Sequence, residues 1–169
     1  MKFLFPLLLL FLSASLSAQI EWLSWEEAVA RNASEPRKMM VDVYTDWCGW
    51  CKRMDKTSFV DPAVTEYVNE HFYAVKLNAE QREPIQFDGH EFTYDPTLSR
   101  RGVHTLAVAL LDGRMSYPSI VYLDKEQKRI TIAPGFKEAE ALLQELTYVG
   151  GDHFKRQSYA DYVKSQAKK

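Results

Sequence analysis

Both cysteines of this 169-residue chain lie in one short segment, Trp47–Lys52 (WCGWCK). The segment directly follows Met39–Tyr44, an apolar and β-branched run that is typical of a buried strand. Two thiols separated by two residues can close a disulfide and reopen it. At the start of a helix, free backbone N–H groups and the helix dipole would stabilise a thiolate at Cys48. The pattern therefore predicts a strand that leads into a helix, with a redox-capable pair at the junction.

Length and composition are those of one folded domain. The chain can bury a single core but not two of ordinary size. Hydrophobic residues make up 46% of it, which is enough to fill that core without structural disulfides. The formal charge of −2 shows no excess of basic residues, so we expect no nucleic-acid partner.

The N-terminus has the three-part pattern of a secretory signal. Lys2 precedes the apolar run Phe3–Leu12, and small polar residues follow it. The run is too short to cross a bilayer as a helix. We predict a signal peptide over residues 1–18, with cleavage after Ala18; cleavage after Ser17, or retention as an anchor, remains an alternative. The mature chain, residues 19–169, would be a single domain in the periplasm or secreted.

Export bears on the role of the cysteines. Exported proteins usually use cysteines for bridges between distant elements, whereas this chain has one close pair, so a functional pair is favoured over a structural one. Zinc would need four ligands, and haem attachment would need His where Lys52 stands. The four histidines show no metal-binding spacing: His71, His90, His104 and His153. We therefore predict no cofactor and no metal.

Helix caps and hydrophobic periodicity predict the elements before residue 78. Ser24 and Glu27 form a capping box at the start of a helix. Asp61 followed by Pro62 starts another helix. In chain order we expect a helix over 25–33, a strand over 39–45, a helix from the cysteines, a helix from 62 and a strand over 72–77.

Residues 78–101 lack this regularity and are predicted to be an insertion. Within it, Ile85–Phe92 has the pattern of a hairpin, because Asp88-Gly89 suits a two-residue type I′ turn.

The remaining sequence predicts two helices, two strands and a C-terminal extension. Val103–Leu111 has an apolar helical face that ends before Gly113, and helical spacing returns over 139–146 until Gly150. The runs 119–124 and 129–133 read as strands joined by a tight turn. One more helix is expected in an extension over 152–169. These elements predict an α/β fold with a central mixed sheet and helices on both faces.

Several separated segments together resemble the thioredoxin superfamily, and the resemblance covers roughly residues 37–149. They are Val41-Asp42, the WCGWCK segment, Val75–Asn78 and Tyr117–Val121. Within the superfamily the chain is most similar to exported, single-domain bacterial proteins, through Phe59–Val64 and Gly113–Pro118. The resemblance implies a thioredoxin fold, with the insertion placed before the strand that follows Pro118.

The resemblance also implies roles for four further residues. Pro118 would be cis and lie against the disulfide, and the backbone of Tyr117 would pair with the substrate chain. Without the resemblance an ordinary trans proline would be expected there. Asp42 alternates with apolar neighbours on its strand, so burial should raise its pKa and let it accept a proton from Cys51. Lys76 would adjust the pKa of that acid. The alternatives are that Asp42 is an edge residue that faces water and that Lys76 is a solvated strand lysine.

The predicted function is that of an exported thiol-disulfide oxidoreductase. Cys48 would attack a disulfide and Cys51 would resolve the mixed disulfide. Trp47 and Trp50 would offer apolar surface to a partner. Trp50 stands where thioredoxin has proline, so the dipeptide between the cysteines does not fix the potential.

We expect a reductant of exported proteins that carry disulfides or thiols. A membrane or soluble redox partner would recycle it, and the protein itself would be a monomer. One alternative is a binding module that holds apo-proteins or copper, with Met54 and Met115 as the nearby candidate ligands. Another is a reductase dedicated to cytochrome c maturation.

Overall fold

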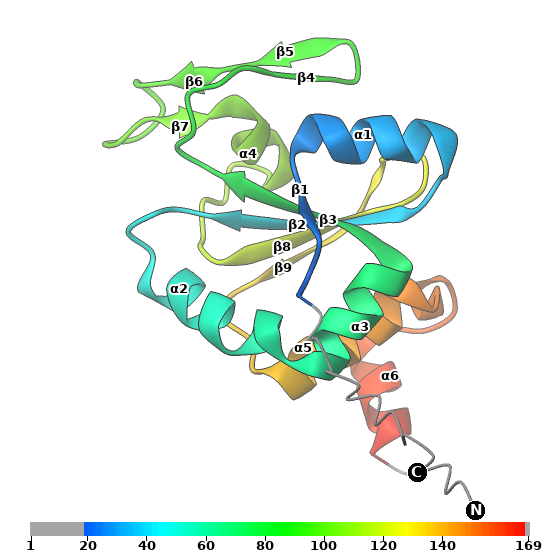
Figure 1. The fold of residues 1–169 in the computed structure, drawn as a ribbon. Helices are drawn as coiled ribbons and strands as arrows, with labels where there is room; N and C mark the ends of the chain where they lie inside the picture. Colours follow the sequence, from blue (N-terminus) through cyan, green and yellow to red (C-terminus); the bar gives the residue numbers. More distant parts are fainter. Residues whose placement is uncertain (1–18, 168–169) are drawn as a thin grey trace, which may run out of the picture.

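A five-stranded mixed sheet forms the centre of the protein (Figure 1). The computed structural model describes residues 19–167. The strand order is β1-β3-β2-β8-β9. Strands β1 (Trp22–Leu23), β3 (Phe72–Asn78) and β2 (Lys38–Tyr44) are parallel, whereas β8 (Ser119–Leu123) is antiparallel to both β2 and β9 (Arg129–Pro134). The predicted mixed sheet is confirmed.

Helices cover both faces of this sheet, as predicted (Figure 1). Alternate residues of the strands point to opposite faces and build two cores. Val41 and Val121 belong to the core under α1 (Trp25–Ser34) and α4 (Thr105–Leu110). Met40 and Ile120 belong to the other core, under α2 (Gly49–Lys56), α3 (Pro62–His71) and α5 (Ala139–Gly150). A 3₁₀ turn, η1 (Ser58–Val60), joins α2 to α3.

The predicted helix starts are confirmed at α1 and α3. The Ser24 hydroxyl accepts from the Glu27 N–H at 3.1 Å, and the Glu27 carboxylate accepts from the Ser24 N–H at 2.8 Å. Asp61 caps α3 through its carboxylate, and Pro62 occupies the first helical position. These caps are local in sequence, which is why the sequence pattern alone identifies them.

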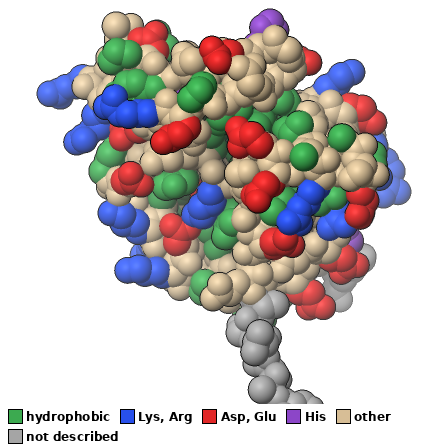
Figure 2. All heavy atoms as spheres, turned by 45° about the horizontal axis from the view of Figure 1, so that its top comes forward, with side chains coloured by type: hydrophobic (Ala, Val, Ile, Leu, Met, Phe, Trp, Pro, Cys, Tyr) green, Lys and Arg blue, Asp and Glu red, His purple; other side chains and the backbone are tan. Residues whose placement is uncertain are grey.

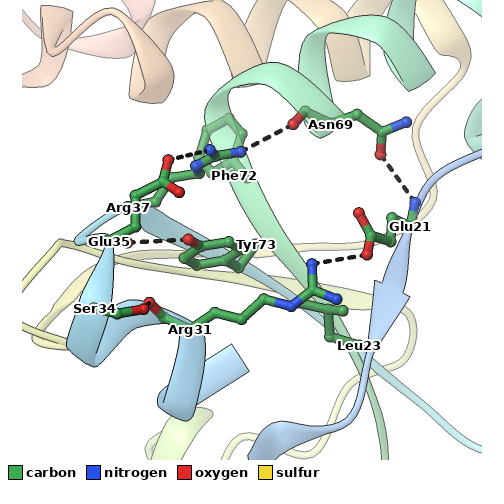
Figure 3. A pocket seen from close by; sticks show the side chains of 9 residues that line it. All are labelled: Glu21, Leu23, Arg31, Ser34, Glu35, Arg37, Asn69, Phe72 and Tyr73. Carbon is green, nitrogen blue, oxygen red and sulfur yellow. Dashed lines mark hydrogen bonds and ion pairs between the residues drawn. The ribbon is translucent and has the colours of Figure 1, made fainter. Parts of the chain in front are cut away.

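The edge strand β1 is not predicted by the sequence pattern. It pairs with Ala74 and Val75 of β3, and Glu21 just before it forms an ion pair with Arg31 at 2.7 Å (Figure 3). The surrounding pocket of about 240 Å³ lies where β2 and β3 begin, at the opposite end of these strands from the cysteines. Its charged groups pair with one another, so we assign it a structural role.

The insertion forms two small antiparallel ribbons. The predicted hairpin is confirmed: β4 (Ile85–Phe87) pairs with β5 (His90–Phe92), and Asp88 and Gly89 take positive φ angles of 50° and 73°. A second ribbon, β6 (Tyr94–Asp95) with β7 (Val103–His104), is not predicted.

The second ribbon corrects the expected helix over 103–111. Val103 belongs to β7, and α4 begins only at Thr105. His104 causes the change, because its imidazole Nδ1 accepts from the Leu106 N–H at 3.3 Å and thereby caps the helix. The insertion therefore extends past Arg101, to the start of α4.

Gly102 provides a direct test of the insertion's fold. Its φ is +73°, and a Cβ there would lie 2.0 Å from the Tyr94 hydroxyl oxygen. Gly102→Ala should therefore lower the free energy of unfolding by about 1–3 kcal/mol, through backbone strain plus the clash. Gly113 is the matched control, since its φ is +71° and a Cβ there would meet no atom within 4 Å. Urea unfolding should show a smaller loss for Gly113→Ala; equal losses would contradict the tight packing against Tyr94.

The predicted C-terminal helix is confirmed as α6 (Tyr159–Gln166), and a short 3₁₀ turn precedes it. After α5 the chain turns at Asp152, whose φ is +57°, into η2 (His153–Lys155). A new cap at Ser158 then starts α6 (Tyr159–Gln166). Tyr162 of α6 is buried and its ring stacks 5.3 Å from that of Tyr148 on α5, which holds the extension against the domain.

The predicted signal peptide, residues 1–18, lies outside the described residues. Over residues 19–167, every helix is too short or too polar to cross a bilayer.

Candidate active site

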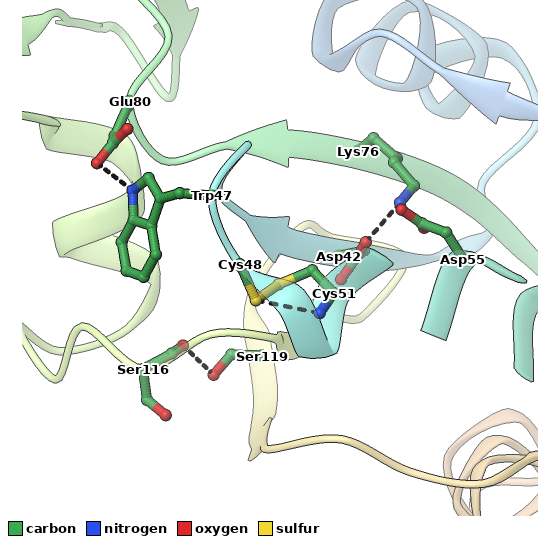
Figure 4. Close-up of a disulfide and its surroundings, with 9 residues drawn as sticks. All are labelled: Asp42, Trp47, Cys48, Cys51, Asp55, Lys76, Glu80, Ser116 and Ser119. Carbon is green, nitrogen blue, oxygen red and sulfur yellow. Dashed lines mark hydrogen bonds and ion pairs between the residues drawn. A yellow bond between two sulfur atoms is a disulfide. The ribbon is translucent and has the colours of Figure 1, made fainter. Parts of the chain in front are cut away.

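The two cysteines lie where β2 ends and α2 begins (Figure 4). Cys48 is the N-cap of α2, and its sulfur accepts from the backbone N–H of Cys51 at 3.1 Å. The two sulfurs form a disulfide, with the Cα atoms 5.3 Å apart. The first turn of α2 carries no acidic side chain that would oppose the helix dipole and backbone N–H groups at Cys48. This is the environment that stabilises a thiolate at Cys48 when the pair is reduced.

The disulfide is recessed between two exposed indoles. Cys48 is 5% exposed and Cys51 2%, whereas Trp47 and Trp50 are 53% and 56% exposed. Cys48 is thus slightly more exposed as a residue than Cys51, in keeping with its predicted role as the attacking thiol. A partner that reaches it must lie along the two tryptophans.

Asp42 is buried on β2, on the Cys51 side of the disulfide in Figure 4. Its carboxylate Oδ2 accepts from the Lys76 ammonium at 2.9 Å, and its Oδ1 has no hydrogen-bond partner in the structure. Burial raises the pKa of Asp42, although the Lys76 charge opposes the shift. The alternative of a water-facing edge residue is wrong, since Asp42 is 1% exposed. Asp42 therefore has one carboxylate oxygen that is unpaired among the described residues.

Lys76 lies between two carboxylates and inside an aromatic box. Its ammonium bonds to Asp42 and to Asp55 of α2. Aromatic rings surround it at 4.9–5.3 Å, from Trp22, Tyr44 and Phe59. Burial lowers the pKa of Lys76, but the two carboxylates outweigh it and the net shift is upward. Lys76 therefore stays cationic, and the solvated-lysine alternative is wrong.

Asp55 is a site residue that the sequence analysis missed. It lies four residues after Cys51 on α2, a spacing that puts both on one side of the helix. A pocket of about 360 Å³ is lined by Asp55 and Lys76. Since the Asp55 side chain is 40% exposed, this pocket links the buried Asp42 to solvent through Lys76.

The peptide bond between Tyr117 and Pro118 is cis, which confirms the prediction. The Ser119 hydroxyl donates to the Ser116 carbonyl at 2.7 Å across this turn (Figure 4). The Tyr117 ring meets that of Trp47 edge to face, with centroids 6.0 Å apart. Burial, helped by the charge of Glu80, raises the pKa of Tyr117 to about 12, so its hydroxyl stays neutral.

Each exposed tryptophan is held by an arginine and an acid that the sequence analysis did not find. The Trp47 indole N–H donates to Glu80 at 2.9 Å, and the Arg101 guanidinium lies 5.6 Å from the ring centroid. Trp50 stacks 5.2 Å from Phe136. The guanidinium of Arg53 lies over both of these rings and forms an ion pair with Glu138 at 3.2 Å. These contacts join distant parts of the chain, so spacing in the sequence gives no signal for them.

Among residues 19–167, no three His, Cys, Asp or Glu side chains are grouped closely enough to hold a metal ion. Of the two methionines considered for copper, Met54 is fully buried in one core and Met115 packs against the other.

Sequence comparisons relate the chain to proteins of thiol-disulfide exchange. A family profile described as "Thioredox_DsbH: Protein of unknown function, DUF255" matches residues 9–161. The Thiol:disulfide interchange protein DsbD of Pectobacterium atrosepticum is 43% identical over 110 residues, which are 64% of this chain and 16% of that protein. Spermatogenesis-associated protein 20 of Mus musculus is 25% identical over 108 residues, 63% of this chain and 13% of that protein. The chain thus spans less than a fifth of the length of these curated relatives.

Solved structures share the fold. A thioredoxin-fold protein from Helicobacter pylori superposes with a TM-score of 0.59 at 19% identity, over 92% of this chain and 96% of its own. A structure named DsbH Oxidoreductase gives 0.57 at 16% identity, over 83% and 88%. A candidate disulphide-isomerase from Bacteroides thetaiotaomicron gives 0.55 at 25% identity, over 80% and 94%. The central sheet, the cysteine pair and the cis proline therefore belong to a thioredoxin fold.

Proposed function

The chain belongs to the Thioredox_DsbH family, and from this premise we propose that it is an exported oxidoreductase that exchanges disulfides with other exported proteins. One observation carries the proposal: a Cys48–Cys51 disulfide at a helix N-terminus, beside a buried carboxylate with an unpaired oxygen. The match to a protein named for thiol:disulfide interchange supports the same chemistry. The signal-like pattern of residues 1–18 supports export.

The reaction begins with the reduced pair. The Cys48 thiolate attacks one sulfur of the partner's disulfide, which forms a mixed disulfide and releases the partner's first thiolate. Asp42 then accepts the Cys51 proton, and the Cys51 thiolate attacks the Cys48 sulfur. The Cys48–Cys51 bond forms while the bond to the partner breaks. Two electrons have then passed to the partner, which leaves with two thiolates. Solvent protonates these thiolates, and Asp42 returns the Cys51 proton to solvent.

We further propose that net flow runs from this protein to its partner. The pairing of Asp42 with Lys76 resembles that of reducing members of the superfamily, and Asp42 acts as a base in the step that completes reduction. A separate redox partner, in the membrane or in solution, would return two electrons to the Cys48–Cys51 disulfide after each cycle.

Equilibration with glutathione tests both parts of the proposal. The potential of the pair should lie near the reducing end of the superfamily range, about −270 mV, rather than near −120 mV. Reduced protein should also reduce a small neutral disulfide such as 2-hydroxyethyl disulfide, followed by Trp47 and Trp50 fluorescence. A potential near the oxidising end would reverse the proposed direction. Failure to exchange with any disulfide would overturn the oxidoreductase itself.

A further inference from the structure

The insertion forms a pocket beside the active site. The pocket has a volume of about 320 Å³. Apolar groups line its inner part, namely Trp47, Val103, Met115 and Tyr117, and Arg100 and Arg101 lie at its exposed rim. Loop residues 99–103 thus lie in the same pocket as the residue before Cys48 and the residue before Pro118.

The rim of this pocket carries unbalanced positive charge. Arg100 and Arg101 form no ion pair within the described part of the chain, and the Arg101 guanidinium lies 5.6 Å from the centroid of the Trp47 ring. The N–H groups of a guanidinium beside a ring can still donate to a carboxylate. Glu80 in the lining accepts from the Trp47 indole N–H and keeps its negative charge, so two arginines and one acid leave the pocket with a net positive charge. Figure 2 brings the insertion forward and shows basic side chains next to hydrophobic ones along the left of this face.

The opposite side of the disulfide differs in charge. Arg53 also lies over a tryptophan there, but Glu138 pairs with it at 3.2 Å. Its charge is therefore balanced within the protein.

We infer that this pocket selects the partner polypeptide, an inference that rests on the proposed function. Its occupant is a large apolar side chain of the partner, close in sequence to the partner's reactive cysteine and accompanied by a carboxylate that pairs with Arg101. The apolar side chain fills the space between Trp47, Val103 and Met115. A segment bound at Cys48 passes both Trp47 and Tyr117, and these two residues form the wall of the pocket.

Four peptides test this inference. Each has one cysteine capped as a mixed disulfide with 2-mercaptoethanol, and neighbours that are Leu with Glu, Leu with Lys, Ser with Glu, or Ser with Lys. Reduced wild-type protein should react about threefold to fivefold faster with Leu/Glu than with Leu/Lys or Ser/Glu. The preference for Glu should shrink in high salt, because the rim is exposed to solvent.

Charge reversal locates the selectivity. Arg101→Glu should invert the ratio of the Leu/Glu and Leu/Lys rates, a ratio in which any change of Cys48 reactivity cancels. Lys125→Glu makes the same change of charge in the exposed turn between β8 and β9, at the end of β8 away from Pro118, and should preserve the ratio. Equal wild-type rates with all four peptides would overturn the inference, as would equal shifts in the two variants. If the wild type fails to reduce 2-hydroxyethyl disulfide, the proposed function itself is wrong.

Discussion

Cys51→Ser should leave the protein covalently joined to its partners. Cys48 remains at the N-cap of α2, where backbone N–H groups and the helix dipole stabilise its thiolate, so it still attacks. Serine cannot resolve the mixed disulfide, because its hydroxyl stays protonated at neutral pH. Turnover of a protein disulfide should fall below detection, while the bond between Cys48 and the partner persists.

The measurement is capture from cells that express the full-length variant, followed by non-reducing electrophoresis. A reductant should cleave every adduct. Cys48→Ser is the matched control, because it removes the attacking thiol while keeping Cys51. Adducts of Cys48→Ser equal to those of Cys51→Ser would assign attack to the wrong sulfur. Absence of adducts from both variants would contradict the exchange mechanism. Capture of cytochrome c precursors alone would make the protein a reductase with one client.

The parts of the site that the sequence predicts are those set by local spacing. The Cys48–Cys51 pair, the caps at Ser24 and Asp61 and the turn at Asp88-Gly89 each depend on residues within four positions of one another. The burial of Asp42 follows from its alternation with apolar neighbours on a strand. The cis peptide bond before Pro118 is predicted from the resemblance to a family, because residue spacing alone would not suggest it.

The parts that the sequence does not predict are contacts between distant segments. Trp47 meets Glu80 and Arg101 only because the insertion folds back to the cysteines. Trp50 meets Phe136 only because the chain after β9 returns to α2. Such contacts have no fixed separation along the chain, so neither hydrophobic periodicity nor a sequence motif predicts them. The features that distinguish this protein from a minimal thioredoxin are therefore also the ones that required its structure.

Asp42→Asn should slow resolution of the mixed disulfide by about a hundredfold at pH 7, the lower end of what a positioned base contributes. The amide keeps the shape of the side chain but cannot accept the Cys51 proton. Resolution then depends on spontaneous ionisation of Cys51, so the rate of the variant should rise about tenfold per pH unit toward the ordinary thiol pKa of about 8.5. The wild-type rate should depend less on pH. Release of a peptide from a preformed mixed disulfide at Cys48 measures this step directly.

Stability provides an independent readout of the same carboxyl. Burial raises the pKa of Asp42 above its ordinary value of 3.8, so the native state holds this proton more tightly than the unfolded chain. The contribution of Asp42 to the free energy of unfolding of the wild type therefore decreases as pH rises from 3.8 to the raised native pKa. Above that pKa the contribution no longer changes with pH. Asp42→Asn has no carboxyl that titrates at this position. The free energy of unfolding of this variant, relative to that of the wild type, should therefore increase between pH 3.8 and the raised native pKa. Asp55→Asn is the control for the slowed resolution, because the Asp55 side chain is 40% exposed and is not the proposed proton acceptor. A stability difference that is flat with pH, together with unchanged resolution, would remove Asp42 from the mechanism, since a buried proton acceptor must alter both.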